Sequence, residues 1–256
     1  MANEINIKFN STNIGTSYNI ALSQIGIKEM KSVKLTPIPK TDGSIAEEAR
    51  RSGLSIDMQG SITGADYDAL RTNIDTFKSV LQTGIQKFTI DDDRYINAQL
   101  KDFSYSYKTL RTFANWSASF SAHYPYWQAE LASSDIRTPV SGGTYVISNP
   151  GNAPSRAKIL VTSGKITINN DIKIENVTNG QSLQYNGILL GTGKILEIDN
   201  RYDTDDFQVL NNAVDDIVNF EGDFLEIAAG TNYIKYTGSA SGTVPEVAIY
   251  YRGVWL

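Results

Sequence analysis

The stretch NPGNAPSRAKILV, residues 149–161, opens the half of the chain that decides its fold class. Its first part holds two prolines and a glycine, which favour a turn, and its last part places apolar side chains at every second position, which predicts a strand. Short runs of the same kind follow, among them KITI, IKIEN, SLQYN, ILEID, FLEIA, NYIKYTG and EVAIYYRG. Because Gly, Asn and Asp turns separate these runs, we expect a β-sandwich or jelly roll.

The first half of the chain is also expected to be rich in strands. At its start Ile5, Ile7 and Phe9 alternate with polar residues, the two-residue period of a half-buried strand. Further strands are expected at 25–27, 33–35, 54–58, 86–90, 95–107 and 115–124, with a hairpin turn at the acidic run 91–94. Residues 37–53 combine prolines, glycines and charges, so we expect an exposed loop or extended arm there.

Residues 63–84, TGADYDALRTNIDTFKSVLQTG, predict the one helix. Apolar residues recur in it at spacings of three and four, and they are Tyr67, Leu70, Ile74, Phe77 and Leu81. Thr63 is expected to cap the helix, Asp66 and Asp68 to favour its positive end, and Gly84 to end it. We expect the apolar stripe to pack against the protein's own sheet instead of binding a partner.

The composition narrows the functional class. The 256 residues are enough for one large β domain or two ordinary ones. A net charge of −5 implies no basic surface for nucleic acid, and the lack of cysteine excludes disulfides and thiolate metal sites. The N-terminus lacks signal-peptide features, and no stretch approaches the roughly 20 apolar residues of a membrane span. We therefore expect a protein folded in the cytoplasm, with neither membrane insertion nor sequence-specific nucleic-acid binding.

No motif predicts a reactive centre. The stretch GILLGTGK, residues 187–194, has the wrong glycine spacing for a phosphate-binding loop and lacks the Ser or Thr after the lysine. The acidic clusters at 91–93 and 203–206 lack the glycine and glutamate of a calcium loop, so solvated turns are preferred. His123, the only histidine, is expected to pack at a strand end. We predict no catalytic, cofactor-binding or metal-binding residue, and no enzymatic activity.

Aromatic residues leave a second function open. Tyr124, Tyr126, Trp127 and Tyr185 could stack on a sugar, as in a carbohydrate-binding module for a host cell-surface polysaccharide. Aromatic residues at a domain junction are more often core or interface, and nothing singles out the carboxylate pair that a glycosidase needs. Carbohydrate binding is therefore the alternative to a purely structural role.

A change of composition divides the chain. The segments SGG and NPGNAPSR flank the strand TYVIS, and the seam is placed between Gln128 and Gly143. We predict two domains, residues 1–135 and residues 136–256.

Three short motifs follow one another in the second half of the chain. The first is a turn with Asn149, Gly151, Asn152 and Pro154. The second holds Gly230, Asn232 and Ile234 after Ala229, and the third is a final strand with Tyr250, Tyr251, Arg252, Trp255 and Leu256. In this order they resemble the distal tail (Dit) proteins of long, non-contractile-tailed bacteriophages. In that family the second domain opens with such a turn, later carries a Pro-Gly-x-Asn-x-Ile segment, whose proline is Ala229 here, and ends in such a strand. The order of strands, helix 66–82, hairpin and aromatic segment HYPYW extends the resemblance over nearly the whole chain.

The resemblance implies a mainly β protein with one α-helix. Its first domain would be a β-sandwich or barrel-like unit that forms a hexameric ring around a channel for DNA. Its second domain would be a galectin-like β-sandwich. The implied role is a structural hub of a tail tip or baseplate, in contact with the tail tube protein, a tail-associated hub or lysin protein and a receptor-binding protein. The protein would be located in the virion tail.

Overall fold

The computed structural model describes residues 6–15, 20–32, 35–37, 44–46, 50–91, 93–107, 112–163, 168–188, 193–201, 207–240 and 245–256. The chain divides into two compact units, Met1–Trp127 and Gln128–Leu256. This division lies earlier than the expected boundary at 135/136, because β11 (Ser133–Arg137) pairs along its whole length with a strand of the second unit. Within the described part, no helix has the length and hydropathy to cross a bilayer.

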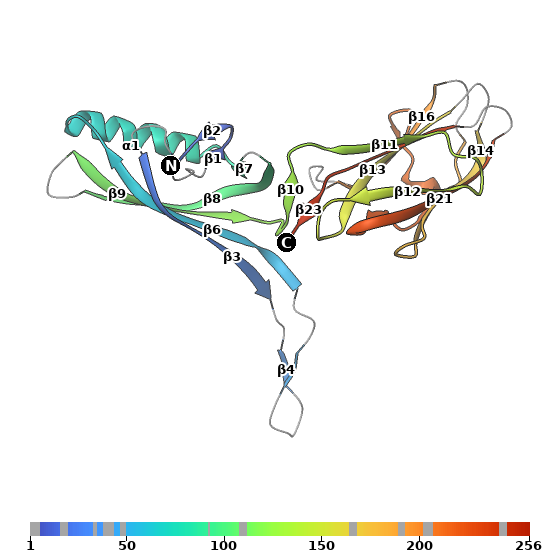
Figure 1. Ribbon diagram of the computed structural model, residues 1–256, viewed down its shortest axis with the longest axis horizontal. Helices are drawn as coiled ribbons and strands as arrows, with labels where there is room; N and C mark the ends of the chain where they lie inside the picture. The colour runs from blue at the N-terminus through green and yellow to red at the C-terminus, as the bar shows by residue number, and fades with distance from the viewer. Residues whose placement is uncertain are drawn as a thin grey trace. The chain divides into compact units, whose positions relative to one another are not determined.

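The first unit is an antiparallel sheet with one helix on its face (Figure 1). Its elements are β1 (Ile7–Phe9), β2 (Thr12–Asn13), β3 (Ile20–Ser32), β4 (Leu35–Pro37), β5 (Ser44–Ala46), β6 (Arg50–Thr63), α1 (Tyr67–Leu81), β7 (Gln86–Ile90), β8 (Arg94–Tyr107) and β9 (Phe113–Ala122). The strand order is β2-β1-β7-β8-β9-β6-β3, and β4 pairs with β5. The short β10 (Trp127–Ala129) lies at the boundary between the units.

The sheet of the first unit curls over its own core. Phe9 of β1 and Phe88 of β7 contact Phe120 of β9, with ring centroids 5.1 and 5.5 Å apart. In a flat sheet β1 and β9 would be about 14 Å apart, since neighbouring strands are spaced by about 4.8 Å. The curl therefore gives this unit the barrel-like character that was expected, in one continuous path of strands and not in two separate sheets.

The helix α1 packs on the curled sheet as its apolar spacing predicts. Its buried side chains are Leu70, Ile74, Phe77 and Leu81. The expected cap is wrong by three residues, because Thr63 is still the last residue of β6. Asp66 caps the helix instead, and its carboxylate accepts a hydrogen bond of 2.7 Å from the Ala69 N–H. Gly84 follows in the left-handed region with φ +85°, where glycine is favoured.

Several expected strands are much longer than the sequence indicates. The short strand at 25–27 is part of β3, and the one at 54–58 is part of β6, which pair with each other over most of their length. The expected loop at 37–53 is in part strand, because β5 and the beginning of β6 fall within it. Residues Ile5 and Val33, and the rest of the expected arm at 38–43 and 47–49, lie outside the described residues.

The second unit is a sandwich of two antiparallel sheets. Its further elements are β12 (Thr144–Asn149), β13 (Ser155–Thr162), β14 (Ile168–Asn176), β15 (Gln181–Tyr185), β16 (Ile195–Asp199), β17 (Gln208–Asn211), β18 (Val214–Asp215), η2 (Ile217–Asn219), β19 (Phe220–Gly222), β20 (Glu226–Ile227), β21 (Gly230–Ala240), β22 (Glu246–Tyr251) and β23 (Val254–Trp255). One sheet has the order β11-β22-β13-β16-β17-β18 and the other β12-β21-β14-β15-β19. Their facing side chains, such as Ile159 and Ile234, form one core. The mainly β fold class with one α-helix is confirmed.

Buried asparagines hold the turns of the second unit in the motifs that suggested a family. The Asn149 amide donates to the Ala153 and Ile227 carbonyls at 2.9 and 3.0 Å, and its oxygen accepts from the Gly151 N–H. Asn232, also fully buried, accepts from the Ala228 N–H at 2.8 Å. Each amide satisfies backbone groups that would otherwise be buried without partners. These motif residues therefore act on the fold and not on a ligand.

Candidate assembly surface

One edge of the first unit's sheet is the long strand β3. It pairs with β6 along one side, and no other described strand lies along its opposite side. Its side chains include Ile27, which is 48% exposed. A strand edge of this kind presents unpaired N–H and C=O groups that can pair with another chain. β3 is therefore a surface suited to association.

The opposite edge is formed by the second half of β8. β7 pairs with β8 only from Arg94 to Ala98, whereas β9 pairs with it from Gln99 to Tyr107. β10 also pairs with β8, and β7 leaves the side of β8 opposite β9 unpaired from Gln99 onward. The sheet thus has a second free edge, and it is a different surface from β3.

The direction of the strands makes the two edges compatible. Consecutive strands in the order β8-β9-β6-β3 are antiparallel, so β3 runs antiparallel to β8. If β3 of one copy lies beside β8 of the next, the antiparallel pairing continues across the junction. Contact between two different surfaces is head-to-tail, and such contacts repeat until the assembly closes into a ring or extends as a filament.

Three exposed tyrosines lie beside the β8 edge. The Tyr107 ring is 5.5 Å from that of Tyr105 and 5.8 Å from that of Tyr67, measured between centroids. Partial burial and the two neighbouring tyrosines raise the pKa of Tyr107. Tyr67 was expected in the buried stripe of the helix, but it is exposed and packs on Tyr107. Exposed tyrosines are enriched among the residues that anchor protein interfaces.

The face of the sheet that α1 does not cover is polar and made of small side chains. Its residues on β6 and β9 are Ser55, Asp57, Gln59, Ser61, Asn115, Ser117, Ser119 and Ser121. The Ser119 hydroxyl donates to Asp57 at 2.6 Å, and the Ser104 and Ser117 hydroxyls are 2.8 Å apart. A hollow of 360 Å³ on this face is lined by Asp57, Asp102 and their neighbours. This face presents hydroxyls and carboxylates, and Lys28 of β3, the register partner of Ser55, adds an ammonium group.

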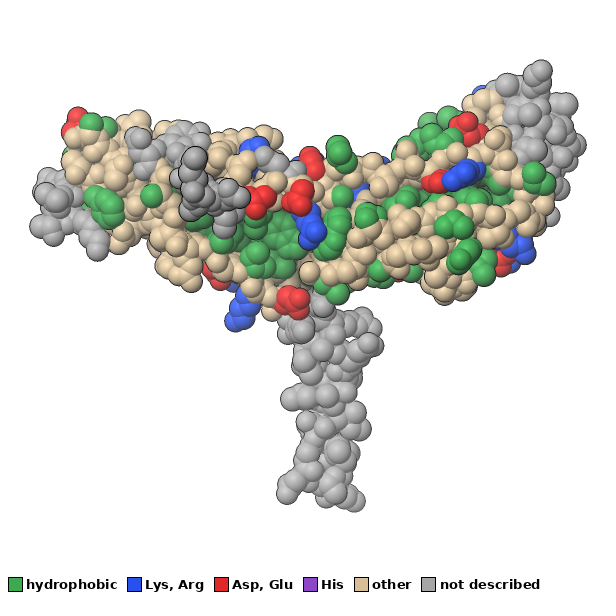
Figure 2. Space-filling view, in the orientation of Figure 1, with side chains coloured by type: hydrophobic (Ala, Val, Ile, Leu, Met, Phe, Trp, Pro, Cys, Tyr) green, Lys and Arg blue, Asp and Glu red, His purple; other side chains and the backbone are tan. Residues whose placement is uncertain are grey.

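The charged side chains do not gather by sign. On the face drawn in Figure 2, Lys and Arg appear singly or beside Asp and Glu, without an extended basic patch. A surface of this kind has little to hold the phosphates of nucleic acid. The face in Figure 2 and the net charge of −5 therefore both argue against a basic surface for nucleic acid.

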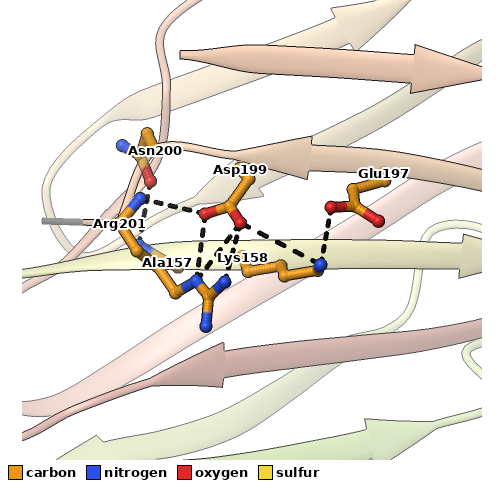
Figure 3. Close-up of polar contacts among 6 residues, drawn as sticks. All are labelled: Ala157, Lys158, Glu197, Asp199, Asn200 and Arg201. Atoms are coloured by element: carbon orange, nitrogen blue, oxygen red, sulfur yellow. Dashed lines mark hydrogen bonds and ion pairs between the residues drawn. The ribbon is translucent and has the colours of Figure 1, made fainter. Parts of the chain in front are cut away.

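The most buried group of charges is in the second unit and is internally paired (Figure 3). The Asp199 side chain is 3% exposed and accepts hydrogen bonds from Arg201 at 2.9 and 3.0 Å. Lys158 lies 2.5 Å from Glu197 and 4.0 Å from Asp199, between them. Asn200 accepts from the Ala157 N–H at 2.9 Å and joins β16 to β13. These contacts join β13 to β16, and each of the four charged side chains has a partner of opposite charge.

The structure does not bring the described polar residues considered in the sequence analysis together in one site. His123 is exposed just after β9, so the expectation that it packs there is wrong. Asp91 forms the tight turn of the β7–β8 hairpin with φ 57°, as expected, while Asp92 and residues 203–206 lie outside the described part. The Lys194 N–H donates to the Ser163 hydroxyl at 3.0 Å. Among the described residues, no three metal-ligating side chains gather.

The aromatic residues expected to meet a sugar are mostly turned inward. Tyr185 is fully buried, and its hydroxyl donates a hydrogen bond of 2.5 Å to the Asp216 carboxylate. The prediction that its ring could stack on a sugar is therefore wrong. The position of Tyr185 two residues after the buried Leu183 could have indicated this, since both lie on one face of β15. Trp127 packs against the first core, and Tyr124 and Tyr126 pair with each other at 5.8 Å. An exposed tyrosine that sequence reasoning did not select, Tyr233, lies on β21.

The arrangement of strands can be compared with solved structures. The crystal structure of the SPP1 Dit protein, described as a paradigm of the hub adsorption apparatus in phages that infect Gram-positive bacteria, is similar with a TM-score of 0.75 and 12% sequence identity. The match covers 99% of this chain and 100% of that chain. The chain has the Dit fold.

Two further comparisons add little to the Dit fold assignment. A chain of the phage P2 baseplate in its activated conformation with Ca matches with a TM-score of 0.46 and 10% identity, over 96% of this chain and 98% of that chain. No protein-family model matches the chain, and no curated protein matches it. At 12% identity the Dit fold was recognisable in the sequence only through short motifs at turns and in the final strand.

Proposed function

We propose that this protein is a structural component of a bacteriophage tail tip or baseplate, and that its first unit forms a hexameric ring. The observation that carries the proposal is the pair of free, antiparallel edges β3 and β8 on opposite sides of one sheet. The Dit fold of the whole chain supports it. The protein works by shape and association, without a reactive group.

Edge pairing makes the ring a single closed sheet. Each copy contributes β8, β9, β6 and β3, and closure pairs the free edge of every β3 with the free edge of a neighbouring β8. The tyrosines Tyr67, Tyr105 and Tyr107 pack against the incoming β3 of the neighbour, where Ile27 supplies an apolar contact. Such aromatic anchors supply much of the binding energy in protein interfaces.

The polar face of the sheet lines a central channel for DNA. Its hydroxyls and the carboxylates of Asp57 and Asp102 do not bind phosphates, and the two carboxylates offset Lys28 on the same face, so the passing DNA is not retained. α1 then lies on the outside of the ring, because it covers the opposite face. Each copy also carries the second unit, a galectin-like sandwich. The neighbours are the tail tube protein, a tail-associated hub or lysin protein and a receptor-binding protein, all within the virion tail.

The test measures the mass and shape of the purified full chain. Light scattering after size-exclusion chromatography should give six times the chain mass of 28.2 kDa, and negative-stain images should show a six-fold annulus. Assembly should rise with concentration, as for any association of separate copies. A particle that stays monomeric at every concentration tested would rule the ring out.

A further inference from the structure

The outer face of the β12-β21-β14-β15-β19 sheet carries one strongly exposed aromatic residue among its described side chains. Tyr233 is 51% exposed, next to the buried Asn232 and Ile234 that point into the core. Val146 of β12 is its partner across the strand pair, and the Val177 N–H donates to the Tyr233 carbonyl at 2.8 Å. Both valines are exposed, so the tyrosine lies between two small apolar side chains.

A group of charges lies on the same face, beside this tyrosine. Lys235 is two residues after Tyr233 on β21 and therefore shares its face of the sheet. Glu175 of β14 pairs in register with Lys235, and its carboxylate lies 4.0 Å from the Lys235 Nζ and 3.1 Å from the Lys173 Nζ. Gln184 of β15 is the register partner of Lys173 and adds an amide. The adjacent strands β21, β14 and β15 thus place hydrogen-bond donors and acceptors on the same face of the sheet.

This composition fits a small polar ligand better than a protein. The centre of a protein interface is depleted of charged residues and holds a cluster of apolar anchors. Here one aromatic ring is followed on its own strand by an ammonium group, Lys235, with the carboxylate of Glu175 beside it on the next strand. Lys173 and Gln184 lie two residues further along, in register with Thr237. Small-molecule sites combine an apolar surface with a few placed polar groups in this way. A pyranose ring matches both parts, since it has an apolar C–H face and hydroxyls on its rim.

We propose that this face binds a pyranose saccharide, with the Tyr233 ring stacked on one sugar and Lys235 and Glu175 bound to its hydroxyls. The ionic pairing of the two lysines with Glu175 fixes the side chains before the sugar binds, which lowers the entropic cost of binding. The proposal goes beyond the ring: it uses only residues of the second unit, and neither proposal requires the other.

The test uses the purified full chain on an array of pyranose oligosaccharides, followed by calorimetric titration with each sugar that binds. Tyr233→Ala should weaken binding about tenfold, the equivalent of about 1.4 kcal/mol. Tyr233→Phe should bind within about threefold of the unmodified protein, since the ring is kept. Ile136→Ala is the matched control, because Ile136 is 53% exposed on a strand of the other sheet, and it should change nothing. Light scattering on the same samples reports the ring separately.

Either of two results would overturn the proposal. One is that no sugar on the array binds at millimolar concentration, and the other is that Tyr233→Ala binds as well as the Ile136→Ala control. If Tyr233→Ala changes the assembled mass while no sugar binds, the face contacts protein and the saccharide site is wrong. Near-ultraviolet circular dichroism of each variant verifies that a loss of binding is not a loss of folding.

Discussion

At the scale of single residues, Asp199 is the charge on which the second unit depends most. Its carboxylate is buried and holds Arg201 through two hydrogen bonds, with Lys158 nearby. Asp199→Asn removes the charge and leaves the partly buried Arg201 with a weaker partner, while Lys158 keeps Glu197 at 2.5 Å, and the change should cost about 2 kcal/mol of unfolding free energy. Urea unfolding measures the loss. Asp135→Asn is the control, since its partner Arg137 is largely exposed and such surface pairs contribute little to stability. Equal losses in both variants would contradict this assignment.

Tyr236 is a second residue with a defined effect, because its hydroxyl is buried. The hydroxyl finds no hydrogen-bond partner among the described residues, and burial raises the pKa of Tyr236 to about 12. The unfolded chain ionises near pH 10, so it loses protons first, and stability falls as the pH rises from about 10 towards 12. Tyr236→Phe should be neutral or stabilising by up to about 1 kcal/mol at pH 7. Urea unfolding at pH 7 and pH 11 checks both statements: the variant should lose less stability at pH 11 than the unmodified protein does.

At the scale of elements, the strand β3 decides whether copies associate. Ile27→Lys places a charge on the edge that the proposed neighbour covers, so association should weaken by about tenfold, as when a charge is buried without a partner. Ile188→Lys is the matched control, because Ile188 is 48% exposed, as Ile27 is, and belongs to the second unit. Light scattering over a range of concentrations compares the two. A ring that survives Ile27→Lys as well as Ile188→Lys would show that β3 is not the contact.

The elements also show what a sequence can and cannot predict here. The helix was found because its stripe has a period that only a helix buries, but its cap was missed because β6 runs on through Thr63. The hairpin at Asp91 was found from turn residues. The free edges of β3 and β8 were not located, because strand order depends on pairings between distant segments and leaves no local pattern. The exposure of Tyr233 was not predicted either. Alternation along the strand gives two faces of the sheet but does not say which of them the second sheet covers.

At the scale of the whole molecule, the distribution of charge predicts how the assembled ring treats DNA. Asp57 and Asp102 lie on either side of Ser119 in one row across the polar face, so they sit on the proposed channel wall. The unmodified ring should not retain DNA, because the carboxylates of Asp57 and Asp102 offset the ammonium group of Lys28, which lies on the same face as the register partner of Ser55. With Asp57→Lys and Asp102→Lys together, every copy adds two cations to the wall, and the ring should retain DNA at low salt and release it as salt rises. Gel-shift experiments at several salt concentrations measure this retention of DNA.

The control carries the same change of charge at Asp215→Lys and Asp223→Lys, both exposed in the second unit. If that control retains DNA as strongly as the channel variant, the effect is one of net charge, and the polar face is not the channel wall.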